Sequence, residues 1–219
     1  MVFSLQQLSI SAESNQGVTV SSETAYFVQG RSFKTDVFLE SQVDIVGFQW
    51  RFTYDDTVYA LKDLDSDFEL VENLEPGVIT VNYVNTSEPL NGRSVVLTLT
   101  FDVLTAFNFE DERYLLHLDE DYRQEVVTLE GTANLSVVPQ VNYELGAVKR
   151  AVLGDVNGDG VVSIIDVAMI QLFLAQAYEL SDREKMVANV TNSSDGEVNL
   201  QDVMTMQLYI VGNIQSLEV

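Results

Sequence analysis

The sequence contains no cysteine and only one histidine, His117. Without cysteine, disulfide bonds and zinc sites built from thiolates are excluded. One histidine is too few for a multi-histidine metal centre, and no Ser-His-Asp triad is evident around it. Basic residues are scarce as well, since 11 Lys and Arg stand against 34 Asp and Glu and give a formal net charge of −23. Such a surface repels phosphate groups, so we expect neither nucleic acid nor an anionic membrane as a partner.

Long apolar runs are also missing, because no segment approaches the roughly 20 consecutive apolar residues of a membrane span. The first residues, MVFSLQQLSIS, have neither the basic region nor the long apolar run of a signal peptide. Export of the protein would therefore mean that a leader has been removed or that a larger chain has been trimmed. The 219 residues have an apolar share of 46%, which is typical of a folded protein of one large or two ordinary domains.

The chain from about residue 16 to residue 138 has the pattern of β-strands. Its apolar stretches are rich in β-branched and aromatic residues, and several alternate apolar with polar positions. In the stretch GFQWRFTYD, Phe48, Trp50 and Phe52 point to one side of a strand and Gln49 points to the other. Many short strands without a helical pattern predict an antiparallel sandwich or jelly roll, with Trp50 in its core.

After Pro139 the pattern changes to helical. In residues 166–176 and 202–212, apolar positions recur three and four residues apart. We therefore expect two domains, residues 1–143 and residues 144–219, the second beginning with a short linker. The helical segments are copies of each other at an offset of 36 residues. The matched residues are Asp166, Val167, Gln171, Leu172, Phe173 and Leu174 in the first copy, and Asp202, Val203, Gln207, Leu208, Tyr209 and Ile210 in the second.

A loop rich in oxygen donors precedes the first helical segment, in the stretch GDVNGDGVVSIID. Calcium is bound by oxygen ligands, and in a twelve-residue loop they come from positions 1, 3, 5, 7, 9 and 12, with glycine at position 6. Gly160 falls on position 6. The six ligand positions are occupied by Asp155, Asn157, Asp159, Val161 through its carbonyl, Ser163 and Asp166. The pattern predicts a calcium site, and the alternative is an acidic turn that caps a helix with Asp166.

The loop of the second copy is two residues longer, because the offset upstream of it falls to 34. Its predicted ligands are Asn189, Thr191, Asp195, Glu197 through its carbonyl, Asn199 and Asp202. Counting strictly back from Asp202 would instead place Thr191 and Ser193 at positions 1 and 3. Fewer carboxylates predict weaker binding than in the first loop, and the alternative is a degenerate loop held by its neighbour. Two calcium ions are thus expected as cofactors.

Residues 151–214 closely resemble the dockerin family. In that family a loop and a helix are followed by a connector helix, here near residues 181–188, and then by a second loop and helix. The resemblance implies a calcium-stabilised module that binds a cohesin domain. Carried over from the family, loop positions 10 and 11 and the helix faces after them contact that partner. Here these positions are Ile164 and Ile165, with Leu200 and Gln201 in the second copy. The alternative is that the two isoleucines belong to the core.

The strand-rich half resembles the cohesin family, in the stretches VDIVGFQWRFTYDDTVYALKDL and SVVLTLTFDVL. The fold class expected for the whole chain is therefore an all-β antiparallel jelly-roll sandwich followed by a small all-α, duplicated calcium loop–helix domain. Related carbohydrate-binding jelly rolls share the strand pattern. In that alternative Tyr54, Tyr59 and Tyr83 form a platform on which a sugar stacks. The competing interpretation is that the three tyrosines pack in the core.

These resemblances imply a non-catalytic adaptor of an extracellular, cellulosome-like, carbohydrate-active complex. Its partners would be cohesin or dockerin domains of other proteins, with self-association as a further route, and its localisation would be secreted or on a bacterial cell surface. The alternative function is the C-terminal fragment of a glycoside hydrolase whose sandwich is a carbohydrate-binding module.

Overall fold

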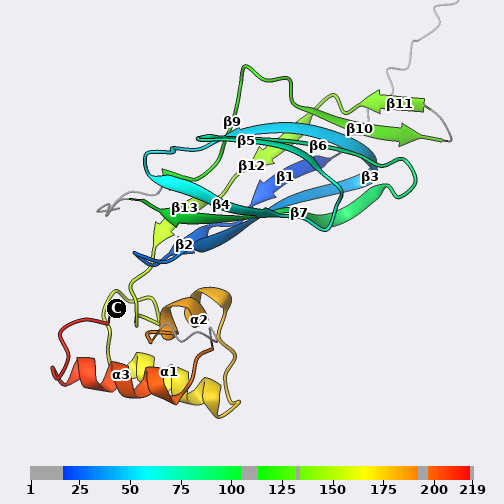
Figure 1. The fold of residues 1–219 in the computed structure, drawn as a ribbon. Coiled ribbons are helices and arrows are strands. Elements are labelled where there is room, and N and C mark those ends of the chain that lie inside the picture. The colour runs from blue at the N-terminus through cyan, green and yellow to red at the C-terminus, as the bar shows by residue number, and fades with distance from the viewer. Residues whose placement is uncertain (1–16, 105–112, 132–133, 192–196, 218–219) are drawn as a thin grey trace, which may run out of the picture.

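The computed structural model describes residues 17–104, 113–131, 134–191 and 197–217. They form two modules, which Figure 1 shows one above the other: a β-sandwich, made by the strands, and a helical module, residues 151–217. Each module has a hydrophobic core of its own. No helix in the described part of the chain has the length and apolar character that crossing a membrane requires.

The sandwich is built from short strands around one long strand. The strands are β1 (Val18–Ser22), β2 (Ala25–Phe27), β3 (Phe33–Thr53), β4 (Tyr59–Asp65), β5 (Val71–Glu75), β6 (Val78–Val84), β7 (Leu90–Val103), β8 (Arg113–Tyr114), β9 (His117–Leu118), β10 (Glu125–Glu130), β11 (Asn134–Val137), β12 (Val141–Glu144) and β13 (Ala147–Arg150).

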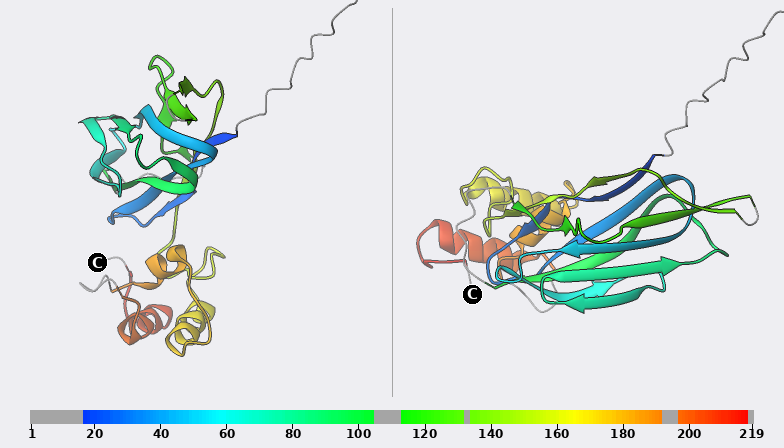
Figure 2. Two further views of the ribbon diagram at one scale, coloured as in Figure 1. Left: turned by 90° about the vertical axis from the view of Figure 1, so that its right-hand side faces the viewer. Right: turned by 90° about the horizontal axis from the view of Figure 1, so that it is seen from above.

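Strand β3 belongs to both layers of the sandwich. Its first half, residues 33–41, pairs with β1 and β7. Its second half, residues 45–53, pairs with β6 and β10. The long strand therefore passes from one layer into the other, and the remaining strands extend each layer outward from it, as the view from above in Figure 2 shows.

The side-chain alternation along β3 changes phase where the strand changes layers. Phe33, Val37 and Leu39 are buried in the first half, and Trp50 and Phe52 are buried in the second. Odd-numbered positions thus face the core before the bend and even-numbered ones after it. The pairing with β7 is irregular between Ser41 and Ile45, and such an irregularity bends a strand and re-aims its side chains. Both halves can therefore bury their apolar face in the same core.

The core of the sandwich is aromatic, and the prediction that Trp50 lies in it is confirmed. Trp50 is fully buried and stacks on Phe48, with ring centroids 3.9 Å apart. Tyr54, Tyr59 and Tyr83 are 9%, 2% and 4% exposed. They pack against other rings of the core and do not form an exposed platform on which a sugar could stack, which contradicts that alternative.

Among the described residues, two strand pairings are parallel and the others are antiparallel; the last two strands of the sandwich form the parallel ones. Strand β12 pairs with β1 in parallel, and β13 pairs with β2 in parallel. Strand β13 leads directly into the helical module. The pairing with β2 is continued by Ala151, whose N–H donates to the carbonyl of Phe27 at 2.8 Å. The division of the chain after residue 143 stays a prediction.

The helical module contains α1 (Ile164–Leu174), α2 (Asp182–Ala188) and α3 (Leu200–Ile210). Each helix begins with a capping box, in which the N-cap side chain and the side chain three residues later each accept from the other residue's N–H. The N-caps are Ser163, Ser181 and Asn199. The polar residues before each apolar run therefore fix where the helices start, and the predicted connector helix is α2.

Candidate metal and partner-binding sites

Asp155 organises the first loop. Its Oδ1 accepts the N–H groups of Gly158 and Asp159 at 2.9 and 3.1 Å, and its Oδ2 accepts the N–H of Gly160 at 3.0 Å. The chain therefore winds around the Asp155 carboxylate, which is buried. Positive φ angles at Gly158 and Gly160, 75° and 88°, make this tight winding accessible to glycine.

The next ligand positions continue the turn. The amide oxygen of Asn157 accepts the N–H of Asp159 at 2.9 Å, and its Nδ2 donates to Asp159 Oδ2 at 2.8 Å. Asp159 Oδ1 accepts the N–H of Val161 at 2.9 Å. The side-chain oxygens of alternate residues are thus held within one turn of the loop by hydrogen bonds, and a cation site needs oxygens gathered in this way.

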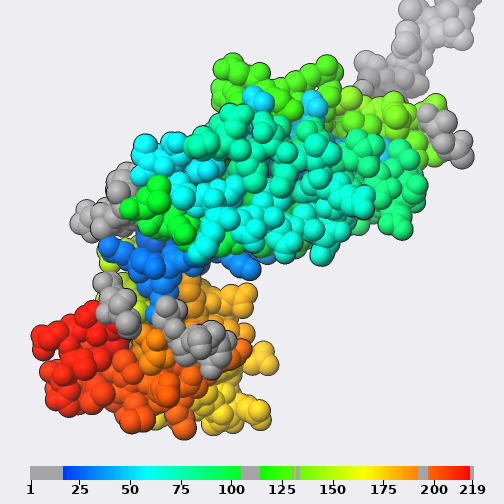
Figure 3. Space-filling view, in the orientation of Figure 1, coloured from blue at the N-terminus to red at the C-terminus, as the bar shows by residue number. Residues whose placement is uncertain are grey.

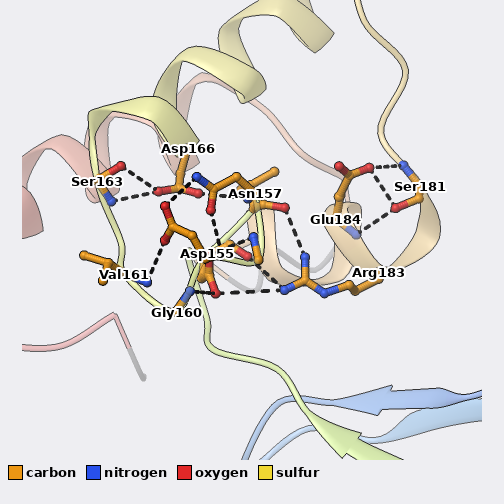
Figure 4. A network of polar contacts seen from close by, with 12 residues as sticks. Asp155, Asn157, Gly160, Val161, Ser163, Asp166, Ser181, Arg183 and Glu184 are labelled. Atoms are coloured by element: carbon orange, nitrogen blue, oxygen red, sulfur yellow. Dashed lines mark hydrogen bonds and ion pairs between the residues drawn. The ribbon is translucent and has the colours of Figure 1, made fainter.

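Asp166 closes the first loop from its far end, as Figure 4 shows. Its Oδ1 accepts the N–H of Asn157 at 3.0 Å, and its Oδ2 accepts the N–H and hydroxyl of Ser163 at 2.8 and 3.1 Å. Asp166 is fully buried. All three of these donors are neutral, so a buried carboxylate has no cationic partner among the described residues, which is costly unless a cation is bound.

The second loop is closed by the same bonds. Asp202, also fully buried, accepts the N–H of Thr191 at 3.0 Å through Oδ1 and the N–H of Asn199 at 2.8 Å through Oδ2. Thr191 therefore corresponds to Asn157 of the first loop. This correspondence favours the alignment in which Asn189 and Thr191, and not Thr191 and Ser193, take positions 1 and 3.

Asn189 at the proposed first position supplies a further observation that suits a cation. Its Oδ1 is buried and has no hydrogen-bond partner among the residues that the structure describes. Asn199 Nδ2 donates to the carbonyl of Glu197 at 3.3 Å. Asp195, the predicted fifth-position ligand, lies outside the described residues.

The donor set of both loops suits a hard cation. Among the described residues, no three carboxylates or histidines gather into a metal-ligating cluster by themselves. The other oxygens come from amides, a hydroxyl and the backbone, and an all-oxygen set of this mixed kind is what calcium accepts. The residues therefore fit calcium, while the identity of each ligand stays a prediction.

Apolar side chains are exposed where each loop runs into its helix. Ile164 and Ile165 are 62% and 56% exposed, Leu200 is 67% exposed, and Gln201 is exposed as well. The alternative that the two isoleucines are core residues is therefore wrong. The module instead buries Val167 and Ile170 of α1.

Each exposed set continues along its helix, on the helix faces that the dockerin resemblance implied without naming their residues. The α1 face consists of Ile164, Ala168 and Leu172, and the α3 face consists of Leu200, Met204, Leu208 and Val211. The members lie three or four residues apart, on the side away from the buried positions. The sequence carried a signal for these faces, because apolar residues recur at this spacing on the side of each helix opposite its core-facing residues.

The comparisons with known proteins match the two modules to different families of structures. Residues 153–211 match the family model described as Dockerin type I domain. No curated protein is significantly similar to the chain.

Solved structures resemble the sandwich. A non-cellulosomal cohesin from the hyperthermophilic archaeon Archaeoglobus fulgidus is 16% identical over 62% of this chain and 91% of its own, with a TM-score of 0.50. The seventh ScaB type I cohesin from Pseudobacteroides cellulosolvens is 15% identical over 62% and 92% of the two chains, with a TM-score of 0.49. At these identities the likeness shows the fold alone, and the archaeal structure is the one on which that assignment rests.

Proposed function

We propose that this chain, a cohesin-like sandwich followed by a type I dockerin module, is a non-catalytic adaptor of an extracellular assembly. Cohesin and dockerin modules are interaction domains without catalytic centres. The helical module binds a cohesin of another protein, and the sandwich receives a dockerin. We also propose that the protein is secreted and that it joins a carbohydrate-active complex. The same proposal places the boundary between the two domains after residue 143.

One observation carries the proposal: each buried loop-closing carboxylate, Asp166 or Asp202, is followed by an exposed apolar helix face. Asp166 and Asp202 are also the third residues of α1 and α3 and complete their capping boxes, so calcium held by these carboxylates would fix the first turns of both helices. Binding a cation only to the folded loop stabilises the module by mass action. The α1 and α3 faces are then held rigidly for a partner.

The sandwich offers its own exposed apolar residues to a dockerin. Val71 and Leu74 on β5 and Val84 on β6 are exposed on neighbouring strands. Trp50, by contrast, is fully buried and unavailable for contact. The burial of the three tyrosines also removes the platform that the carbohydrate-binding alternative required.

The test is binding of the full chain to immobilised cohesin domains in calcium and in chelator. We expect binding in calcium and none in chelator. A parallel assay with dockerin domains tests the sandwich. Binding to insoluble glycan, without binding to either domain, would favour the glycoside-hydrolase alternative. A molecular mass that rises with protein concentration in calcium, but not in chelator, would identify self-association. Such heterologous contacts between copies would give open chains.

The calcium part has its own variant. Asp159→Ala removes one predicted ligand carboxylate, and we expect a lower melting temperature of the helical module in calcium. Glu179→Ala, which removes an exposed carboxylate outside both loops, is the matched control. Equal melting temperatures for the two variants in calcium would contradict the assignment of Asp159.

A further inference from the structure

The turn after β2 connects the two hydrophobic cores. Phe27 belongs to the core of the sandwich, and its ring lies 6.1 Å from that of Phe33. The next residue, Val28, is 2% exposed and packs in the core of the helical module, together with residues such as Val156 and Leu217. Figure 3 shows this early part of the chain, in blue, between the two modules. The modules are therefore joined by packing as well as by the chain.

A guanidinium lies against the start of the first loop. Arg183 of α2 donates to the backbone carbonyls of Asp155 and Val156 at 3.3 and 3.0 Å. The same guanidinium lies over the ring of Tyr26 in β2, 5.7 Å from its centroid. Arg183 thus fixes the first turn of the loop and touches the sandwich at the same time.

The second loop has a guanidinium in the corresponding place, but it comes from the other module. Arg31, in the turn between β2 and β3, donates to the backbone carbonyl of Asn189 at 2.7 Å. Asn189 aligns with Asp155, so both loops present the carbonyl of their first position to an arginine. The sequence explains the different origin, because no Lys or Arg follows Lys185.

The surroundings of Arg31 match this role. Burial lowers the pKa of the guanidinium from its ordinary value, and the nearby Asp202 carboxylate counteracts that effect. Arg31 remains charged at neutral pH, since its ordinary pKa is far above it. The positive charge near Asp202 by itself opposes a second cation there, so the positioning role rests on the hydrogen bond with which Arg31 holds the loop's first residue.

We propose that the β2–β3 turn is the docking surface of the sandwich for its own helical module, and that Arg31 is a positioning residue of the second calcium loop. Calcium binding in that loop and docking of the modules then support each other, because coupling between two sites is reciprocal. The coupling rests on calcium binding in the second loop as proposed above, whereas the docking does not depend on it.

The docking leaves the partner-binding faces free. It uses α2, the starts of the loops and Val28, and in Figures 1 and 2 helices α1 and α3 lie on the side of the module farther from the sandwich. A cleft of about 880 Å³ separates α2 from the neighbouring sandwich surface beside Tyr26 and Lys34. The contact is therefore confined to β2 and the turn after it, and it presents the α1 and α3 faces outward.

The test uses the full chain with Arg31→Met, which keeps an apolar stem and removes the guanidinium. In an Asp166→Asn background, calcium binding to the first loop is expected to be about 10- to 100-fold weaker, so the tighter step of a calorimetric titration reports the second loop. We expect its affinity to fall about 10-fold or more, the usual effect of losing a group that orients a metal ligand. Arg31→Lys, which keeps one charged donor, should restore part of the affinity.

Residual dipolar couplings of the calcium-bound chain report the docking. We expect the two modules of the wild-type chain to fit one alignment tensor and those of Arg31→Met to need two. The control is Arg93→Met, which removes a guanidinium paired with Glu23 and stacked over Phe38 on the sandwich, and it should behave as wild type in both measurements.

Each part of the inference has an outcome that overturns it. One tensor for Arg31→Met would overturn the docking role of Arg31. Unchanged or increased calcium affinity in that variant would overturn the positioning role. If the second loop of the Asp166→Asn chain binds no calcium even with Arg31 present, the proposed function of that loop fails, and the dipolar couplings still decide the docking.

Discussion

The carboxylate of Asp202 accepts hydrogen bonds from both the backbone N–H and the hydroxyl of Thr191, at 3.0 and 2.8 Å. Asp166 holds the N–H of Asn157 in the same way at 3.0 Å. Two loops of unequal length are thus closed by one pattern of bonds, and the two extra residues of the second loop fall between its closed ends.

The first prediction concerns these two closing carboxylates. Asp166→Asn and Asp202→Asn keep the size of the side chain and remove its charge. We expect each variant to weaken calcium binding in its own loop by about 10- to 100-fold, since losing a charged interaction costs about 1.5–3 kcal/mol. Calorimetric titration should show one tight site fewer in each variant. Two unaltered sites in either variant would show that the carboxylate is no ligand and only caps its helix.

The second prediction concerns Ile165, which lies beside the α1 face at the start of the helix. Ile165→Asp places a charge on a side chain that is 56% exposed, so folding and calcium affinity should change little. Binding to a cohesin should fall by at least about 100-fold, because an unpaired charge would be buried at the interface. Leu135→Asp is the matched control, because it places the same charge on an exposed apolar side chain of the sandwich outside the proposed binding surfaces. Loss of calcium-dependent helicity in Ile165→Asp would place the residue in the fold and not in the interface.

The third prediction concerns the core of the sandwich. Trp50→Ala should destabilise it by about 3–5 kcal/mol, as the removal of a large buried ring does. Trp50→Phe should cost less, because a ring remains to stack on Phe48 and the buried Nε1, which has no partner among the described residues, disappears. Denaturant unfolding followed by circular dichroism measures both. A cost below about 1 kcal/mol for Trp50→Ala would be incompatible with its full burial.

The fourth prediction concerns pH and the cap of α2. Burial acts to raise the pKa of Glu184, but hydrogen bonds from the N–H and hydroxyl of Ser181 and from Tyr178 outweigh it and hold that pKa below its ordinary value. A carboxylate with a lowered pKa contributes stability above its unfolded-state pKa, and the contribution is lost as pH falls through the folded-state pKa.

Glu184→Gln tests this sign, because glutamine keeps a capping oxygen and loses the charge. The variant should melt below the wild type at pH 7, and the two melting temperatures should converge as the pH is lowered toward 3. A difference that persists unchanged at pH 3 would assign the effect to packing and not to the charge of Glu184.

Local features of the sequence predicted the loops and helices well. The capping residues Ser163 and Asn199 lie three positions before Asp166 and Asp202, and glycine stands where the first loop bends. Each of these signals acts within a dozen residues, so reading the chain in order was enough. The burial of Trp50 followed likewise from its alternation with Phe48 and Phe52.

Features that depend on residues far apart in the chain had no such signal. The three tyrosines Tyr54, Tyr59 and Tyr83 look alike in sequence whether they face sugar or core, and the packing of other rings against them decides for the core. The alignment of the second loop was ambiguous in the sequence, and the bond from Thr191 to Asp202 favours the one with Asn189 and Thr191 at positions 1 and 3.

The sequence by itself determined that this protein pairs a strand-rich module with a duplicated, oxygen-lined loop–helix module, because strand alternation, caps and loop spacing are local rules. Only the tertiary structure decided that Val28 packs in the core of the helical module and that Arg31 holds Asn189, 158 residues away in the chain. The physical reason is that a turn residue and a loop carbonyl become partners only after both modules have folded and their surfaces have met.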